Sequence, residues 1–203
     1  MSKYVVKTMW GVMLLALIIS AVAPYERSTW WMEVAPIFII TPVLWWTRKS
    51  FPLTSLLLGL IALHSLVLII GGTYTYARVP FGFYLQDALH LSRNPYDKIG
   101  HFMQGFVPAL AARELLIRHS WVLNTRVAAF MGVCVAMTVS AVYELIEWWA
   151  ALLLGQGADA FLGTQGDVWD TQSDMFFALI GSTLAMCLFS RWQDRQITRL
   201  HGA

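Results

Sequence analysis

The sequence predicts an all-α membrane protein, a single bundle of six transmembrane helices that occupies residues 1–203. Three observations lead to this fold class. The composition is 58% hydrophobic and only 13% charged, whereas soluble domains carry about 25% charged residues. Apolar runs close to the length that crosses a bilayer recur along the chain, and lysine and arginine fall mainly in alternate loops. The approximate spans are 8–23, 31–46, 53–73, 98–117, 127–153 and 174–190.

The first two spans are short and extend into their flanks. Lys3 and Lys7 precede the first, which ends in small residues as a signal peptide does. We expect a retained anchor instead, because the charge alternation of the later loops requires this span. Tryptophan pairs at 30–31 and 45–46 enclose the second span and are typical of the membrane interface.

The later spans are longer and contain more polar residues. His64 lies inside the third span, where we interpret it as hydrogen-bonded packing. Before the fourth span, Asn94 suits an N-cap and Pro95 the first helical position. Two long outer loops, at about 74–97 and 154–173, follow the third and fifth spans. Long ordered loops often carry function.

The basic residues indicate the orientation. Ten of the 14 lysines and arginines lie in one set of loops and at both termini, and four lie in the other set. Positive loops stay inside, so we expect both termini in the cytoplasm. The acidic residues show the converse pattern, with ten of the 12 in the outer loops or near the outer ends of helices.

The fourth span opens with an acid and a histidine at helical spacing. Asp97 and His101 are four residues apart, so both lie on one helix face. Asp97 also falls in the first turn, where a carboxylate caps the helix and complements its dipole. A carboxylate beside an imidazole can orient it, raise its basicity or share a metal ion. The two interpretations are compatible.

The fifth span contains two carboxylates, at Glu144 and Glu147, in an otherwise apolar helix. A charge at membrane depth is costly and usually faces the bundle interior or a wet cavity. Glu147 is adjacent to Trp148, so an interfacial position is the alternative for it. Two carboxylates this close require a cation, a basic partner or a shared proton.

Three aspartates precede or open the sixth span. If the helix starts early, Asp167, Asp170 and Asp174 form one stripe along it. If it starts at Thr171, then Thr171 and Asp174 make a capping pair and Asp167 stays in the loop. Their spacing does not match an EF-hand, so the group is a generic oxygen-rich site.

These polar residues come from three consecutive spans and converge on one membrane face. We predict a polar site that binds a divalent metal ion. Oxygen ligands favour Mg²⁺, Ca²⁺ or Mn²⁺, and a histidine admits Zn²⁺ or Fe²⁺. Compensating charge comes from Lys98 within the motifs, while Arg78 and Arg93 would come from the adjoining loop. The candidate residues are Asp97, His101, Glu144, Glu147, Asp167, Asp170 and Asp174.

Other chemistries lack their signatures. The sequence has no P-loop, dinucleotide fingerprint, nucleophile elbow or HExxH motif, and no basic aromatic surface. We therefore expect neither a nucleotide cofactor nor a nucleic-acid partner. Cys134 and Cys187 lie inside apolar runs and suggest no disulfide. The expected partners are the lipid bilayer and a lipid-linked or small-molecule substrate.

Three segments carry a resemblance to a known family: NPYDKIGHFMQGF, YELIEWW and FLGTQGDVWDTQSDMFFALIG. They resemble the YjdF-type bacterial inner-membrane proteins over about residues 20–190. A wider resemblance is to VanZ-like membrane proteins, which share an Asp-Lys-x-x-His helix start, matched by Asp97, Lys98 and His101. Asp174 and Gly181 of this chain match the pattern of that family's last helix, but Ala178 stands where the family has an asparagine. The resemblance implies a multi-pass protein of the bacterial inner membrane with a polar site, and no known reaction.

Three functions fit these observations. The first is a membrane enzyme that acts on a lipid or envelope precursor from the outer face, with a metal that activates water or clamps a phosphate. The second is a proton- or cation-coupled transporter with Glu144 and Asp97 as protonation sites. The third is a structural or accessory membrane protein whose acids only cap and solvate helix ends. Inverted repeats would favour transport, and the sequence shows none.

Overall fold

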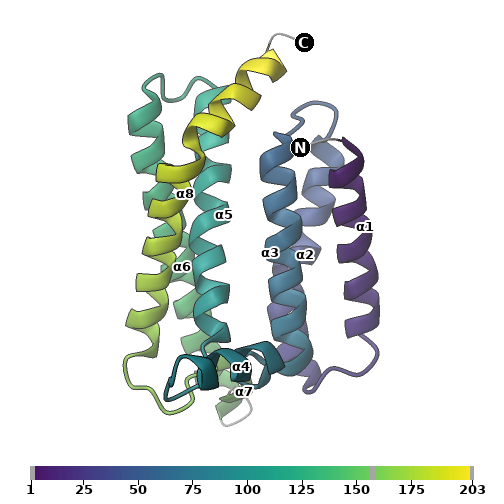
Figure 1. The fold of residues 1–203 in the computed structure, drawn as a ribbon, viewed down its shortest axis with the longest axis vertical. Coiled ribbons are helices and arrows are strands. Elements are labelled where there is room, and N and C mark those ends of the chain that lie inside the picture. The colour runs from purple at the N-terminus through teal and green to yellow at the C-terminus, as the bar shows by residue number, and fades with distance from the viewer. Residues whose placement is uncertain (1–2, 156–158, 202–203) are drawn as a thin grey trace.

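A computed structural model describes residues 3–155 and 159–201, and it is all-helical as the sequence predicts. Long helices form the body of the molecule, and short helices connect them at one end (Figure 1). The long helices are α1 (Lys3–Ser20), α2 (Arg27–Thr47), α3 (Ser55–Tyr74), α5 (Tyr96–Arg118), α6 (Thr125–Leu154) and α8 (Asp170–His201). The short ones are η1 (Tyr76–Arg78), α4 (Pro80–Ala88) and α7 (Asp159–Leu162).

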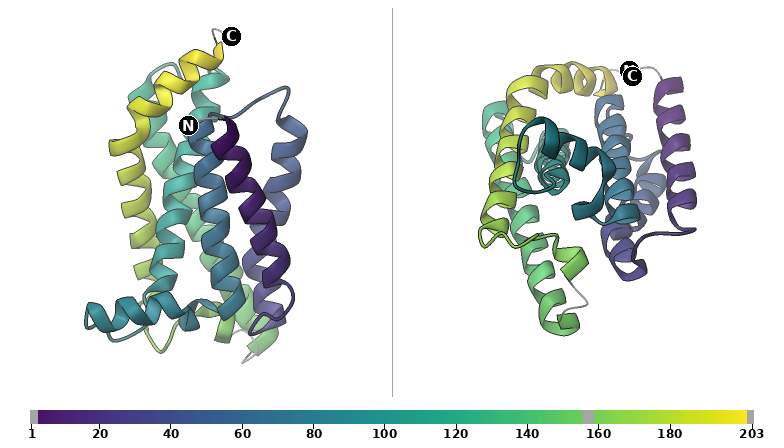
Figure 2. Two further views of the ribbon diagram at one scale, coloured as in Figure 1. Left: turned by 45° about the vertical axis from the view of Figure 1, so that its right-hand side comes forward. Right: turned by 60° about the horizontal axis from the view of Figure 1, so that its bottom comes forward.

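The long helices pack as two groups of three. Helices α1, α2 and α3 form one group, and α5, α6 and α8 form the other (Figure 1). Helix α3 contacts α5 and joins the groups. The start of α1 and the end of α8 lie at the same end of the bundle, while α4 and α7 cover the opposite end (Figures 1 and 2).

Hydropathy and length identify three helices that could each cross a membrane among the described residues. They are Ser55–Tyr74, Thr125–Leu153 and Asp170–Leu200, with mean hydropathies of 2.2, 1.8 and 1.5. A shorter apolar helix, Lys7–Ser20, is a fourth candidate. Helix α2 is rich in tryptophan and proline and α5 carries charged residues, which lowers their hydropathy. The six spans and cytoplasmic termini therefore stay predictions.

Close contact between α5 and α8 places the polar residues of these helices next to one another. A Cβ added at Gly105 of α5 would collide with the carbonyl oxygen of Ala178, and one at Gly181 of α8 with that of Phe102. Small residues allow helix backbones to approach this closely in membranes. Beside this contact, an apolar cluster that includes Leu57, Phe106, Leu110 and Ala185 fills the core between α3, α5 and α8.

The structure shows where two of the predicted helices, α5 and α8, begin. Helix α5 begins at Tyr96, one residue later than predicted, because the Asn94 amide donates to Val79 O and its Oδ1 accepts from Tyr96 N (3.0 Å each). Asn94 therefore makes the N-cap type of hydrogen bond that the sequence predicts, and it also fixes the incoming loop. Helix α8 begins at Asp170, so Asp167 lies in the preceding turn.

Candidate functional site

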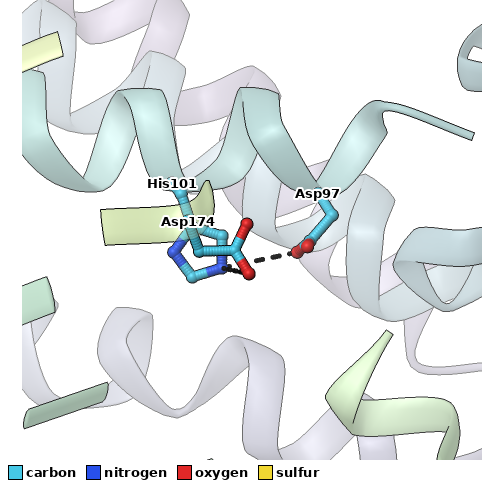
Figure 3. A group of neighbouring side chains, drawn as sticks. All are labelled: Asp97, His101 and Asp174. Atoms are coloured by element: carbon cyan, nitrogen blue, oxygen red, sulfur yellow. Dashed lines mark ion pairs between the residues drawn. The ribbon is translucent and has the colours of Figure 1, made fainter. Parts of the chain in front are cut away.

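A histidine lies at the centre of the polar cluster at the α4 and α7 end of the bundle. His101 Nε2 is 3.4 Å from Asp97 Oδ1, one helical turn earlier, and 3.8 Å from Asp174 Oδ2 on α8. Figure 3 shows the three side chains pointing toward one another. All three are at most 8% exposed. The α5–α8 contact therefore brings two acids to one edge of the imidazole.

The other edge of the imidazole faces α6. His101 Nδ1 lies 3.8 Å from Glu144 Oε1 and 3.0 Å from Gln104 Oε1. Glu144 and Glu147 are both 8% exposed, so both carboxylates are buried inside the bundle. Ligand atoms of His101, Glu144 and Glu147 lie within 4.8 Å of one another, as do those of Asp97, His101 and Asp174. Either group has the size and atoms to hold a metal ion.

Two of the seven predicted residues have a different environment. Asp170 accepts from Lys98 Nζ at 3.0 Å and is 2.6 Å from Arg93 Nη2. Asp167 is 2.9 Å from the same guanidinium nitrogen, and its side chain is 32% exposed. These two acids belong to an ion-pair network beside the histidine and not to the groups that could share a metal.

The three basic residues that were expected to offset the acidic charge have different roles. Arg93 neutralises the two outer aspartates, and its Nη1 donates to Thr164 O at 2.8 Å. Lys98 Nζ donates to Asp174 Oδ1 at 2.6 Å. Arg78 contributes nothing to the cluster, because its guanidinium lies 4.3 Å from the centre of the Tyr25 ring. The position of Arg78 in the loop before α5 therefore did not indicate which residue it contacts.

Two carboxylate oxygens in the cluster have no hydrogen-bond partner. They are Asp97 Oδ2 and Glu144 Oε1, each almost completely buried. Buried acceptors are nearly always hydrogen-bonded in proteins, so each such oxygen requires an explanation. Asp97 Oδ2 has Lys98 Nζ only at 3.9 Å. Glu144 Oε1 lies 3.8 Å from His101 Nδ1, and Asp97 meets the opposite edge of the ring through its other oxygen, Oδ1. Both unpaired oxygens could therefore accept a cation as a ligand.

Sequence reasoning missed one acid of the site, Glu33 on α2. It is 3% exposed, and its Oε2 accepts a hydrogen bond from Tyr143 Oη of α6 at 3.3 Å. Tyr76 adjoins it, and burial, together with the nearby Glu33 charge, raises the pKa of the Tyr76 phenol well above its ordinary value. Tyr76 therefore keeps its proton beside the acid. Glu33 follows a tryptophan pair, which suggested a position near the membrane interface instead.

A cavity of about 320 Å³ extends from this site into the middle of the bundle. Helices α2, α3, α5 and α6 line it, so it lies between the two groups of three helices. Glu33, Asp97, His101 and Glu147 border it at its polar end. His64 also lines the cavity, and its Nε2 has no hydrogen-bond partner. The expectation of a hydrogen-bonded His64 is therefore wrong for this nitrogen.

A second polar cluster, at the terminal end of the bundle, has a structural character. The Glu114 carboxylate is fully buried and accepts from Thr54 N (2.8 Å) and Thr54 Oγ1 (2.6 Å). Arg113 donates to Gln193 and Asp194 of α8. Both Glu114 oxygens are thus hydrogen-bonded, in contrast to the acids around His101. We therefore place the candidate site at His101.

Comparison with known proteins identifies the family. Residues 5–195 match the family model described as "Predicted membrane protein (DUF2238)". The chain belongs to this family. It is also 55% identical over 185 residues to the inner membrane protein YjdF of Escherichia coli (strain K12), which covers 91% of this chain and 88% of that protein. No solved structure matches the chain. The expected resemblance to YjdF-type proteins is confirmed.

Family membership establishes where the protein resides. The DUF2238 chain is an integral, multi-pass protein of the inner membrane. Its buried acidic and histidine cluster therefore lies in a protein that is surrounded by lipid. Large apolar side chains are exposed on its outer helices, for example Leu15 and Ile18 of α1 and Leu152 of α6. In a membrane these side chains contact acyl chains, which explains their exposure.

Proposed function

We propose that this DUF2238 protein is a divalent-metal-dependent membrane enzyme. It acts on a lipid or lipid-linked envelope precursor at the outer face of the inner membrane. The observation that carries the proposal is the buried Asp97–His101–Asp174 group, extended by Glu144 and Glu147, in which two carboxylate oxygens lack a partner. A cation held by either group would satisfy the unpartnered oxygen of that group and offset the mutual repulsion of the acids.

The ligand set suggests the type of chemistry. Carboxylates with a single histidine suit Mg²⁺ or Mn²⁺, and also Zn²⁺ or Fe²⁺. Such an ion can polarise a phosphoryl oxygen or lower the pKa of a bound water, which favours hydrolysis or transfer at a phosphate. In this proposal Asp97, His101 and Asp174 hold the ion. Glu147, which also borders the cavity, is placed to accept a proton from an attacking water.

The outer-face location rests on topology. The start of α1 and the end of α8 lie at the same end of the bundle, opposite the site (Figure 1), as six crossings would require. With the positive-inside rule, this arrangement supports cytoplasmic termini and a site near the outer face.

The metal is tested by thermal unfolding of chelator-treated protein in detergent. Mg²⁺, Ca²⁺, Mn²⁺ or Zn²⁺ should raise the melting temperature, because a ligand that binds only the folded state stabilises it by mass action. At 100 times the dissociation constant the gain is about 2.7 kcal/mol. The double variant Glu144→Gln and Asp174→Asn should abolish the rise. Asp87→Asn, an exposed acid of α4, is the control and should keep it.

A proton-coupled carrier is the second candidate, and the Glu33–Tyr143 contact favours it. This hydrogen bond joins a carboxylate of α2 to a tyrosine of α6 beside the cavity, and protons could occupy the carboxylates of the site in place of a metal. If no divalent ion shifts the wild-type melt, the metal-enzyme proposal is wrong. A proton flux into vesicles that depends on Glu33 would then support the carrier.

A further inference from the structure

The cavity beside the site is amphipathic. Its polar end carries Glu33, Asp97, His101 and Glu147. Away from that end the wall is mainly hydrocarbon, supplied by Pro36, Ile37, Ile40, Ile61, Val107 and Val139. A ligand that fits this division has a polar head and an apolar chain. Protein ligand sites are commonly apolar with a few placed polar groups.

At α6 the cavity wall also reaches the outer surface of the bundle. Val139 lines the cavity and is nevertheless 39% exposed. The backbones of α2 and α6 are not in extensive contact within the described residues. At the polar end they are linked by the hydrogen bond from Tyr143 to Glu33 and by α7, which contacts both helices. The apolar part of the cavity can therefore be reached sideways, from the bilayer, between these two helices.

The size of the cavity limits the occupant. Its volume of about 320 Å³ is at the lower end of the roughly 300–1,000 Å³ found for ligand pockets. It is about twice the 150 Å³ apolar cavity that accepts benzene. One hydrocarbon chain fits such a space, whereas the two chains of a phospholipid together do not.

We propose that this cavity receives a single hydrocarbon chain of a membrane lipid, which enters between α2 and α6 and places the lipid head group against Asp97, His101 and Glu147. The inference deepens the proposed function and rests on it for the reaction, but the binding of the chain does not depend on a metal. The acidic polar end requires a head group that brings hydrogen-bond donors or positive charge, or a phosphate joined through a cation.

Photo-crosslinking tests the proposal. The full chain is reconstituted into vesicles of phosphatidylethanolamine and phosphatidylglycerol that contain a lipid with a diazirine in its hydrocarbon chain. One arm uses a diazirine phosphatidylethanolamine and the other a diazirine polyprenyl phosphate, so that the two sources of a chain are distinguished. Peptide mass spectrometry then locates the label. We expect one of the lipids to label Ile40, Ile61 or Val107 inside the cavity.

A matched pair of variants separates the cavity from the outer surface. Val139→Trp fills the cavity mouth, and labelling inside the cavity should fall about tenfold, equivalent to about 1.4 kcal/mol of binding. Val135→Trp changes the same residue type one turn earlier on α6. Val135 is 41% exposed and does not line the cavity, so this control should leave the labelling unchanged. Ala111→Leu fills the cavity from α5 and should act like Val139→Trp.

The outcomes distinguish this inference from the metal proposal. Label confined to outer surfaces in the wild type, or cavity label unaffected by both filling variants, would overturn the chain-binding inference. If the cavity is still labelled in the presence of chelator and no metal shifts the melting temperature, the chain-binding inference is supported and the metal-enzyme proposal is wrong. A melting temperature that depends on metal, without label in the cavity, would support the metal enzyme and overturn the chain-binding inference.

Discussion

At the scale of single residues, Lys98 neutralises one part of the acidic cluster, the aspartates of α8. Its Nζ lies 2.6 Å from Asp174 and 3.0 Å from Asp170, so it neutralises the α8 side. Asp97, at the same edge of the His101 ring as Asp174, and Glu144, at the opposite edge, retain oxygens without partners. The location of the lysine therefore determines where a cation would be needed. It also makes Lys98 a sensitive point for stability.

Replacement of Lys98 by methionine should destabilise the fold by about 3 kcal/mol, because removing one partner of a buried ion pair leaves an uncompensated charge. Unfolding of the purified variant in detergent measures the loss. The second change Asp174→Asn in the same chain should recover part of it. Lys49→Met, at an exposed lysine of the α2–α3 connection, should have little effect. A Lys98→Met protein as stable as the wild type would show that the aspartates are compensated by other means.

The residues of the site were predictable to different degrees. Helical spacing alone placed Asp97 beside His101, and the charge argument correctly turned Glu144 inward. The pairing of Asp167 and Asp170 with Arg93 was not predictable, because it depends on how the 154–173 loop folds back onto the first long loop. Glu33 was missed since its partners, Tyr76 and Tyr143, come from distant segments.

At the scale of elements, α5 organises the site because it contacts α8 and α6 along its length. Gly105 and Gly181 permit the close crossing with α8, and this crossing determines the separation of Asp174 from His101. The sequence predicted that these helices exist. It also predicted that their acidic residues converge, and the α5–α8 contact agrees with that. It did not predict that the two backbones meet at Gly105 and Gly181.

The variant Gly105→Val should therefore lose stability and disturb the site together. The new side chain would collide with the Ala178 carbonyl, and overpacking of this kind costs about 1–3 kcal/mol. Thermal unfolding gives the loss, and any metal-induced rise in melting temperature should shrink. The matched control is Gly11→Val on α1, where a Cβ meets nothing within 4 Å. Equal melting temperatures for the two variants would contradict the role assigned to the α5–α8 crossing.

At the scale of the whole molecule, the two three-helix groups enclose the cavity between them, and the start of α1 and the end of α8 lie opposite the site. Composition was sufficient to predict an all-helical membrane protein. The number of crossings is harder to derive, because α2 and α5 carry prolines and polar groups that lower their hydropathy below that of α3. A helix that is covered by neighbours can cross a bilayer with such residues, since the bundle buries its polar groups.

Reporter fusions test the six crossings and the orientation. The ten-to-four division of lysine and arginine predicts that a fusion after Ala203 is cytoplasmic, as is one truncated after Ser120 in the α5–α6 connection. A truncated fusion after Leu89, beyond α4, should be periplasmic. Alkaline phosphatase, active only outside the cytoplasm, should therefore be active at Leu89 alone, and a fluorescent protein that folds inside should give the converse. Phosphatase activity at Ala203 would invert the orientation, move the His101 cluster to the cytoplasmic face, and require a substrate that is supplied from that side of the membrane.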